Sequence, residues 1–351
     1  MNEKDLYREM SEKRFSNGVP FTSLPENYVR PLSERPNLHE VTPCDAVPVI
    51  NLNNPNKTQI VKQIQSACES YGFFQVVEHG IPEESIKAMQ QIGKDFFNLP
   101  LQEKLQHYSD DPAKKFRLST SFNVKKEKIH NWRDYLRLHC YPLEDYVHEW
   151  PSNPPSFKEV VSQYSRDVRE LGVRIMELMS QSLGLEGEYI EQALGKQGQH
   201  MAINYYPPCP EPELTYGLPG HTDPNALTIL LQDQVRGLQV LKDGKWVAVD
   251  PIPNAFIVNI GDQLQALSNG RYKSVMHRAV VNSEKERFSF AVFICPSTDA
   301  ELGPIPLLIK DNNPAIYRRF TYGEYYEQFW SGNLDGVHCL EFFRVPSSSG
   351  D

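Results

Sequence analysis

The chain of 351 residues is 40% hydrophobic and 23% charged, a composition typical of globular proteins. Its formal net charge of −9 gives no basic footprint for nucleic acid, and no apolar run of about 18 residues predicts a transmembrane helix. Six scattered cysteines form no C-x-x-C pair, and the charged N-terminus shows no apolar leader. We therefore expect a cytoplasmic protein with reduced thiols that binds neither nucleic acid nor membrane.

The first part of the chain alternates short strands with amphipathic helices. Residues 1–45 are rich in Pro, Glu, Arg and Asn and predict a partly ordered arm. Apolar periodicity then predicts a strand at 47–52, a helix at 57–71, a strand at 72–77 and a helix at 82–97. Residues 107–150 are less periodic, and no element is assigned to them.

A long helix is expected to begin after Ser156. Ser156 and Glu159 match a capping box, in which each side chain bonds a free backbone N–H of the first turn. An apolar stripe runs from Phe157 to Leu178, and Gly184 terminates the helix. The pattern predicts an amphipathic helix that buries one face.

From residue 199 onward the pattern changes to short apolar strands separated by turn residues. Asp243-Gly244 between two apolar runs predicts a hairpin. Further strands are predicted at 255–260 and 288–295, and a helix at 322–330. Helices first and strands later favour a β barrel or sandwich with helices packed outside it.

His221-Thr222-Asp223 places an imidazole and a carboxylate two residues apart. Alternate side chains of an extended chain share one face, so both groups can reach one point. A second imidazole from His277 would complete two histidines and one carboxylate, a set that suits non-haem Fe(II) with open positions opposite. His-x-Asp alone often arises by chance. The order of ligand pair, third ligand and Arg-x-Ser, all in the strand-rich half, favours a metal site.

Arg287 and Ser289 share a strand face by the same alternation. An arginine fork and a hydroxyl suit a carboxylate. Arg287 lies at the end of an apolar strand whose same face continues with Ala291 and Phe293, a place where a charge needs an anionic partner. The plainer interpretation is a strand-edge charge with a structural hydroxyl. Metal ligands near a carboxylate clamp indicate an oxygenase that uses a 2-oxo acid.

Competing interpretations have less support. The sequence contains no phosphate loop, dinucleotide-binding glycine motif or nucleophile elbow. A zinc hydrolase stays open because zinc also accepts His and Asp, but zinc explains the arginine clamp less naturally. A non-catalytic jelly-roll protein that retains a metal is the alternative from a different class. Trp132 and Phe122 are more often core than pocket residues, and Asn204-Tyr205-Tyr206 suits aromatic packing at a strand end as well as function.

The sequence resembles plant Fe(II)/2-oxoglutarate-dependent dioxygenases over about residues 45–335. The motifs that carry the resemblance are Gly72-Phe-Phe-Gln-Val, His79-Gly80, Asn204-Tyr-Tyr-Pro-Pro-Cys209, His221-Thr-Asp223, Gly261-Asp262, Ser268-Asn-Gly270, His277-Arg278 and Arg287-Phe-Ser289. Residues 118–126, 131–140 and 198–201 are similar to the downy-mildew-resistance-type subgroup. Members of this subgroup include salicylate hydroxylases and flavone synthase I enzymes.

The resemblance implies an α+β fold, with a distorted double-stranded β-helix (jelly roll) core and flanking helices. It implies four parts of the chain: an N-terminal arm at 1–45, a mainly helical region packing on the barrel at 46–198, the Fe(II)/2-oxoglutarate core at 199–300, and a C-terminal helical segment and tail at 301–351.

The resemblance also implies roles for individual residues. Fe(II) would be held by His221, Asp223 and His277. The distal carboxylate of 2-oxoglutarate would be bound by Arg287 and Ser289, assisted by Tyr206 and Asn204. Substrate contacts are expected from Phe293, Phe122, Ser121 and Ala202, the last of which lies where anthocyanidin synthase, a relative, has a lysine. No catalytic residue is expected beyond the metal ligands.

The implied reaction uses O2 and 2-oxoglutarate, supported by ascorbate, to hydroxylate or desaturate a small plant secondary metabolite, with release of succinate and CO2. The favoured substrates are a salicylate-type phenolic acid and a flavanone, and an alkaloid or other specialised metabolite is the alternative. We expect a monomer. Gly220, Met276 and Phe288 depart from the residues expected of close subgroup members, which leaves the cofactor chemistry intact and the substrate open.

Overall fold

The structure is a computed structural model that describes residues 21–38, 41, 47–111, 113–120, 127–331 and 339–346. Its helices are α2 (Lys57–Ser70), α3 (Glu83–Phe97), α4 (Leu101–Leu105), α5 (Leu143–Tyr146), α6 (Phe157–Ser182), α7 (Tyr189–Ala193), α8 (Asp262–Leu267) and α9 (Tyr322–Ser331). Its strands are β1 (Val49–Asn51), β2 (Phe73–Val77), β3 (Phe116–Ser119), β4 (Asp134–Tyr141), β5 (Gly198–Tyr206), β6 (Leu218–His221), β7 (Leu227–Gln232), β8 (Leu238–Lys242), β9 (Lys245–Ala248), β10 (Phe256–Ile260), β11 (His277–Ala279), β12 (Arg287–Cys295), β13 (Glu301–Leu302) and β14 (Phe320–Thr321). No helix of the described residues has both the length and the apolarity to cross a membrane.

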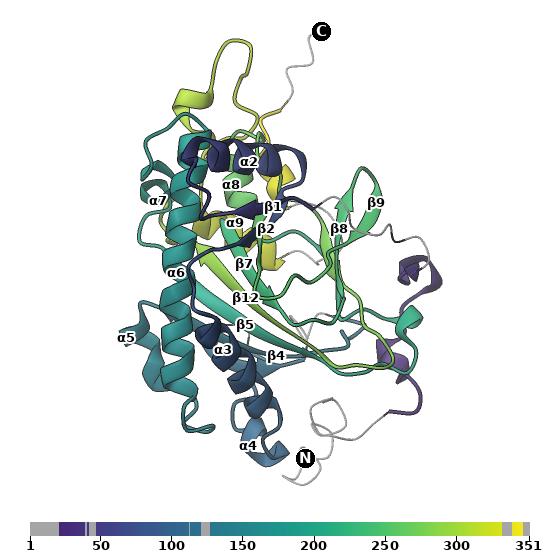
Figure 1. The fold of residues 1–351 in the computed structure, drawn as a ribbon. Helices are drawn as coiled ribbons and strands as arrows, with labels where there is room; N and C mark the ends of the chain where they lie inside the picture. Colours follow the sequence, from purple (N-terminus) through teal and green to yellow (C-terminus); the bar gives the residue numbers. More distant parts are fainter. Residues whose placement is uncertain are drawn as a thin grey trace.

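Two sheets make up the centre of the described chain (Figure 1). The larger has eight strands in the order β1-β2-β10-β7-β12-β5-β4-β3, and the smaller has four in the order β6-β11-β8-β9. The β1–β2 pair is parallel, whereas β10, β7, β12, β5 and β4 pair with their neighbours in antiparallel fashion. Strands distant in sequence are neighbours in space, as in a jelly roll. The predicted α+β jelly roll with flanking helices is confirmed.

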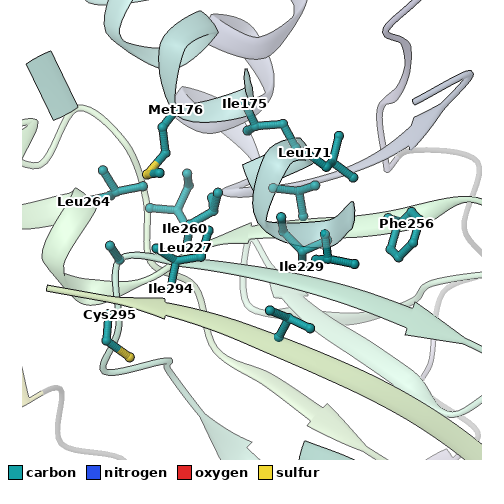
Figure 2. Packing of buried hydrophobic residues seen from close by; sticks show 14 of the residues in the cluster. Leu171, Ile175, Met176, Leu227, Ile229, Phe256, Ile260, Leu264, Ile294 and Cys295 are labelled. Atoms are coloured by element: carbon teal, nitrogen blue, oxygen red, sulfur yellow. The ribbon is translucent and has the colours of Figure 1, made fainter. Parts of the chain in front are cut away.

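Helix α6 covers the outer face of the large sheet (Figure 1). Its side chains Leu171, Ile175 and Met176 lie over Ile229 and neighbouring apolar residues of the sheet (Figure 2). Burial of each such side chain contributes about 1.5–3 kcal/mol. The helix approaches closely at Gly172, because a Cβ there would lie 2.3 Å from the Cδ1 atom of Ile294.

The start of α6 corrects one prediction. The helix begins at Phe157 as the pattern predicted, but the Ser156 side chain makes no capping hydrogen bond, so the predicted capping box is wrong. Ser156 has a near-helical backbone, with φ −85° and ψ 3°, and the Phe157 N–H is already bonded to the Pro154 carbonyl at 2.9 Å. A cap residue normally has an extended backbone, which directs its side chain back over the first turn.

The predicted hairpin joins β8 to β9. Lys242 pairs with Lys245 across the turn, and Asp243 and Gly244 have φ values of 48° and 76°. Positive φ at both central residues is the type I′ geometry that matches the twist of the flanking strands. The hairpin belongs to the small sheet, which lies on the opposite side of the large sheet from α6 (Figure 1).

Strands β3 and β4 come from the region between residues 107 and 150, to which no element was assigned. They extend the large sheet beside β5. The sheet therefore contains strands from both halves of the chain, and its inner face carries side chains from both.

Candidate active site

The two predicted imidazole ligands lie on neighbouring strands. His221 ends β6 and His277 begins β11, and the two residues are directly paired in the antiparallel register. Their ring centroids are 4.2 Å apart. Asp223 follows β6, and its Oδ1 atom lies 3.7 Å from His221 Nε2 and 3.6 Å from His277 Nε2. The structure thus brings the three predicted ligands together, with their ligand atoms all within 4.8 Å of one another.

Neighbouring groups orient these three side chains. The Nδ1 atoms of His221 and His277 lie 2.9 Å and 3.3 Å from the carbonyl oxygens of Pro219 and Val275. With Nδ1–H donating to a carbonyl, each Nε2 keeps a lone pair for a metal. These bonds leave both Nε2 atoms directed at Asp223.

The Asp223 carboxylate is held from its other side. Its Oδ2 atom accepts hydrogen bonds from Thr228 Oγ1 at 2.6 Å and from Asn259 Nδ2 at 2.7 Å. Both donors come from the large sheet, on β7 and β10. Since Oδ2 is occupied, Oδ1 is the oxygen that would bind a metal.

The protonation states also suit a metal. Burial, reinforced by the neighbouring His277, lowers the pKa of His221 to about 3, so this imidazole is neutral near pH 7. Burial opposes ionisation of Asp223, but the two histidines and the bonds from Thr228 and Asn259 hold its pKa below the usual value. Neutral imidazole and carboxylate on one triangular face form the donor set of non-haem Fe(II) centres. The residues therefore fit Fe(II).

The predicted carboxylate clamp lies on the paired strands β5 and β12. Arg287 is opposite Tyr206, and Ser289 is opposite Asn204. Asn204 Nδ2 donates to Ser289 Oγ at 3.3 Å. All four side chains line the cavity that also contains the three ligands.

Arg287 is 2% exposed and positioned by neutral groups. Its Nη2 donates to Gln232 Oε1 at 3.0 Å, and its Nε donates to the Val235 carbonyl at 3.2 Å. The guanidinium carbon lies 5.2 Å from the Tyr206 ring centroid. Gly237 leaves the room for this side chain, because a Cβ there would lie 2.7 Å from Arg287 Cδ. A buried cation held by neutral partners can accept an anionic ligand.

The same two strands continue into the predicted substrate region. Ala291 pairs with Ala202, and Phe293 pairs with His200. The Phe293 and His200 rings are stacked, with centroids 4.8 Å apart and an interplanar angle of 24°. Of the predicted substrate contacts, Phe293 and Ala202 line the cavity. The other two, Ser121 and Phe122, lie outside the described residues.

Several cavity residues were not predicted as site residues. His200 appeared only within a family motif. Helix α9 contributes four aromatic residues to the cavity wall: Tyr322, Tyr326, Phe329 and Trp330. Three arginines line it as well: Arg117 on β3, Arg133 just before β4, and Arg137 on β4. Arg133, Tyr135 and Arg137 alternate along the chain and so share one face of a strand. A strand face with two arginines resembles one that is exposed to solvent.

The fold and this site define the class of protein. A family model of the 2OG-Fe(II) oxygenase superfamily matches residues 197–296, and a model described as non-haem dioxygenase in morphine synthesis N-terminal matches residues 47–156. The chain belongs to the 2OG-Fe(II) oxygenase superfamily and is an Fe(II)- and 2-oxoglutarate-dependent dioxygenase.

Individual proteins are similar to almost the whole chain. Flavanone 3-dioxygenase 2 of Oryza sativa subsp. japonica is 62% identical over 324 residues, which are 92% of this chain and 95% of the relative. Protein DOWNY MILDEW RESISTANCE 6 of Arabidopsis thaliana is 60% identical over 338 residues, 95% of this chain and 99% of the relative. A crystal structure of JOX2 in complex with 2OG, Fe and JA superposes with a TM-score of 0.86 at 39% identity, covering 94% of this chain and 96% of that one.

These similarities confirm three of the expectations drawn from the sequence. The chain resembles the downy-mildew-resistance-type subgroup, it is an oxidoreductase of plant secondary metabolism, and its cofactors are Fe(II) and 2-oxoglutarate. Its substrate is a small molecule.

Proposed function

We propose that this dioxygenase hydroxylates or desaturates a salicylate-type phenolic acid or a flavanone. Relatives that are at least 60% identical over almost the whole chain include a protein named flavanone 3-dioxygenase and a downy-mildew-resistance protein. The wall of stacked Phe293 and His200 supports an aromatic substrate. An alkaloid or other specialised metabolite is the alternative.

The observation that carries the proposal is that two sites open onto one cavity. The triangle of His221, Asp223 and His277 and the buried Arg287 both line it. In the proposed arrangement the triangle holds Fe(II), and Arg287 and Ser289 bind the distal carboxylate of 2-oxoglutarate.

The remaining clamp residues position these groups. Tyr206 packs against the Arg287 guanidinium, and Asn204 is bonded to Ser289, so both fix the clamp before the co-substrate arrives. Leu230 and Leu238 line the cavity with apolar surface, which excludes water from the reacting atoms. When bound, Fe(II), 2-oxoglutarate and O2 would supply the oxidation, in which 2-oxoglutarate takes one oxygen atom of O2 and becomes succinate and CO2. The other oxygen atom enters the substrate, or leaves as water with two hydrogen atoms of the substrate. Ascorbate would support turnover by keeping iron reduced.

The test is oxygen exposure of the Fe(II)- and 2-oxoglutarate-loaded protein with a panel of salicylate, naringenin and an alkaloid. Succinate and product mass are measured together. Salicylate that gains one oxygen atom indicates a phenolic hydroxylase, and naringenin that loses two hydrogen atoms indicates a flavone synthase. Succinate without a product from salicylate or naringenin would contradict the favoured substrates and leave the alternative. No succinate from iron-loaded protein would contradict the proposed site.

Further expectations on location, oligomeric state, partners and the division of the chain accompany this function. We propose that the protein works in the cytoplasm as a monomer, without nucleic acid or membrane. The division of the chain at residues 45, 198 and 300 is likewise proposed, and size-exclusion chromatography with light scattering tests the monomer directly.

A further inference from the structure

The cavity of this protein has a positive lining although the chain has a net charge of −9. Five arginines line it: Arg117, Arg133, Arg137, Arg278 and Arg287. Among the described lining residues, Asp223 is the only carboxylate. In the proposed function Asp223 binds the metal and Arg287 binds 2-oxoglutarate. Cationic groups therefore remain in the part of the cavity left to the substrate.

Arg133 is an arginine of this lining that neutral groups hold in place. It is 3% exposed, and its Nη1 donates to Asn204 Oδ1 at 3.0 Å. Its guanidinium carbon lies 4.5 Å from the Tyr135 ring centroid, which fixes the plane of the group. Its Nε atom has no hydrogen-bond partner but is covered by protein, so Nη2 is the nitrogen that remains for a ligand.

The charge of the guanidinium makes this nitrogen selective. Nη2–H can donate a charge-assisted hydrogen bond to a carboxylate, which is about twice as strong as a bond to a neutral acceptor. Nη1 is the nitrogen that the protein uses, through Asn204. A carboxylate also compensates this buried positive charge, whereas a neutral substrate does not.

The floor beside Arg133 has room for one aromatic ring. Along β5 the cavity side chains follow the order His200, Ala202 and Asn204, and Ala202 faces Ala291 of β12. His200 and Asn204 are about 13 Å apart along the strand, and the two alanines between them leave the floor open. A ring can lie over the alanines, beside the stacked pair of Phe293 and His200, with its acid group toward Arg133.

We propose that the Arg133 guanidinium binds the carboxylate of an aromatic acid substrate through Nη2, and so selects acids over neutral aromatics. This inference rests on the proposed function and deepens it. It separates two substrates that the proposed function leaves open, because a phenolic acid carries the anion and a flavanone does not.

The test compares binding of two ligands of nearly equal size, one an anion and the other neutral. Salicylate and its neutral amide, salicylamide, are titrated calorimetrically into Fe(II)- and 2-oxoglutarate-loaded protein without oxygen. The wild-type protein is expected to bind salicylate more tightly than salicylamide. In Arg133→Met the Kd for salicylate rises on the order of 10- to 100-fold, since a hydrogen bond between charged groups is lost, and the Kd for salicylamide changes less than about threefold. Arg133→Lys, which keeps the charge and loses the planar guanidinium, falls between them.

Arg236→Met is the matched control. This arginine is 75% exposed and pairs with Asp250 on the surface, away from the cavity lining. Its removal is expected to leave both Kd values within about twofold of wild type. Thermal denaturation of each variant verifies that it is folded.

Three results would overturn the inference. One is wild-type protein that binds salicylamide as tightly as salicylate, a comparison that needs no variant. Another is an equal rise in the Kd values of salicylate and salicylamide in Arg133→Met. The third is a rise in the Kd of 2-oxoglutarate as large as that of salicylate, which would assign Arg133 to the co-substrate. Succinate release from 2-oxoglutarate alone, measured on the same wild-type protein, reports separately whether the oxygenase function holds.

Discussion

The two donors on Asp223 Oδ2 provide a direct way to perturb the metal site without touching a ligand. Thr228→Val removes the hydroxyl that donates to Oδ2 at 2.6 Å and keeps the shape of the side chain. Asn259 still donates at 2.7 Å, so the carboxylate loses one of its two anchors. Loss of a hydrogen bond to a charged group costs about 1.5–3 kcal/mol. Loss of a supporting contact to a metal ligand weakens metal binding about 10- to 100-fold, which is a similar free energy.

A second effect of the same substitution must be separated from the first. Thr228 Oγ1 also accepts from Asn225 Nδ2 at 3.0 Å, and the loss of this acceptor lowers the free energy of unfolding of the metal-free protein by about 1–3 kcal/mol. Anaerobic calorimetry of Fe(II) binding, combined with urea denaturation of metal-free protein, measures the two effects independently.

Thr222→Val is the matched control for this experiment. Thr222 is a buried threonine between two of the ligands, and its hydroxyl bonds Asp262 at 3.4 Å, not Asp223. The Fe(II) Kd of this control is expected to stay within about threefold of wild type. An unchanged Fe(II) Kd in folded Thr228→Val would refute the claim that this bond orients the ligand.

Three further predictions concern the co-substrate, the acid stability and the C-terminal helix. Arg287→Met is expected to raise the KM for 2-oxoglutarate on the order of 10- to 100-fold, and an unchanged KM would contradict the clamp. Burial, with nearby cations, lowers the pKa of His139 to about 3, and burial lowers that of His200 well below its usual value. The unfolded chain therefore binds protons below about pH 6.5 that the folded chain does not, so stability falls as the pH falls. His139 alone is expected to lower the free energy of unfolding by about 2 kcal/mol at pH 5. Urea denaturation of wild type and His139→Gln at pH 7.5 and pH 5 tests this. Equal pH dependence of the two proteins would contradict it. Tyr325→Phe removes a buried hydroxyl that donates to Asp262 at 2.6 Å and ties α9 to α8. It should lower the free energy of unfolding by about 1.5–3 kcal/mol, and a change below about 0.5 kcal/mol in urea denaturation would contradict this.

The closeness of His221 to Asp223 and of Arg287 to Ser289 could be predicted because their spacing is a local property. His221 and Asp223 lie two residues apart, as do Arg287 and Ser289, and the alternation of an extended chain decides which side chains share a face. The pairing of His221 with His277 across two strands is not local. It was reached through the chemistry of the donor set, which calls for a second imidazole.

The arginine-lined wall could not be predicted by the same means. Arg117 and Arg137 lie on β3 and β4, where polar side chains face an interior cavity and not solvent. Strand prediction assumes that the buried face is apolar, so these strands gave a weak signal. The capping box failed for a different reason, because the spacing of Ser156 and Glu159 was correct but the backbone of Ser156 is near-helical and not extended.

The most direct test of the whole account is Fe(II)-dependent succinate release from 2-oxoglutarate, compared between His221→Ala and His148→Ala. Both substitutions remove a histidine, but the His148 side chain is 68% exposed and is not among the described residues that line the cavity. The account predicts that His148→Ala retains wild-type release and that folded His221→Ala releases no more succinate than metal-free protein. Wild-type release from His221→Ala would contradict the assignment of His221, Asp223 and His277 as the iron site.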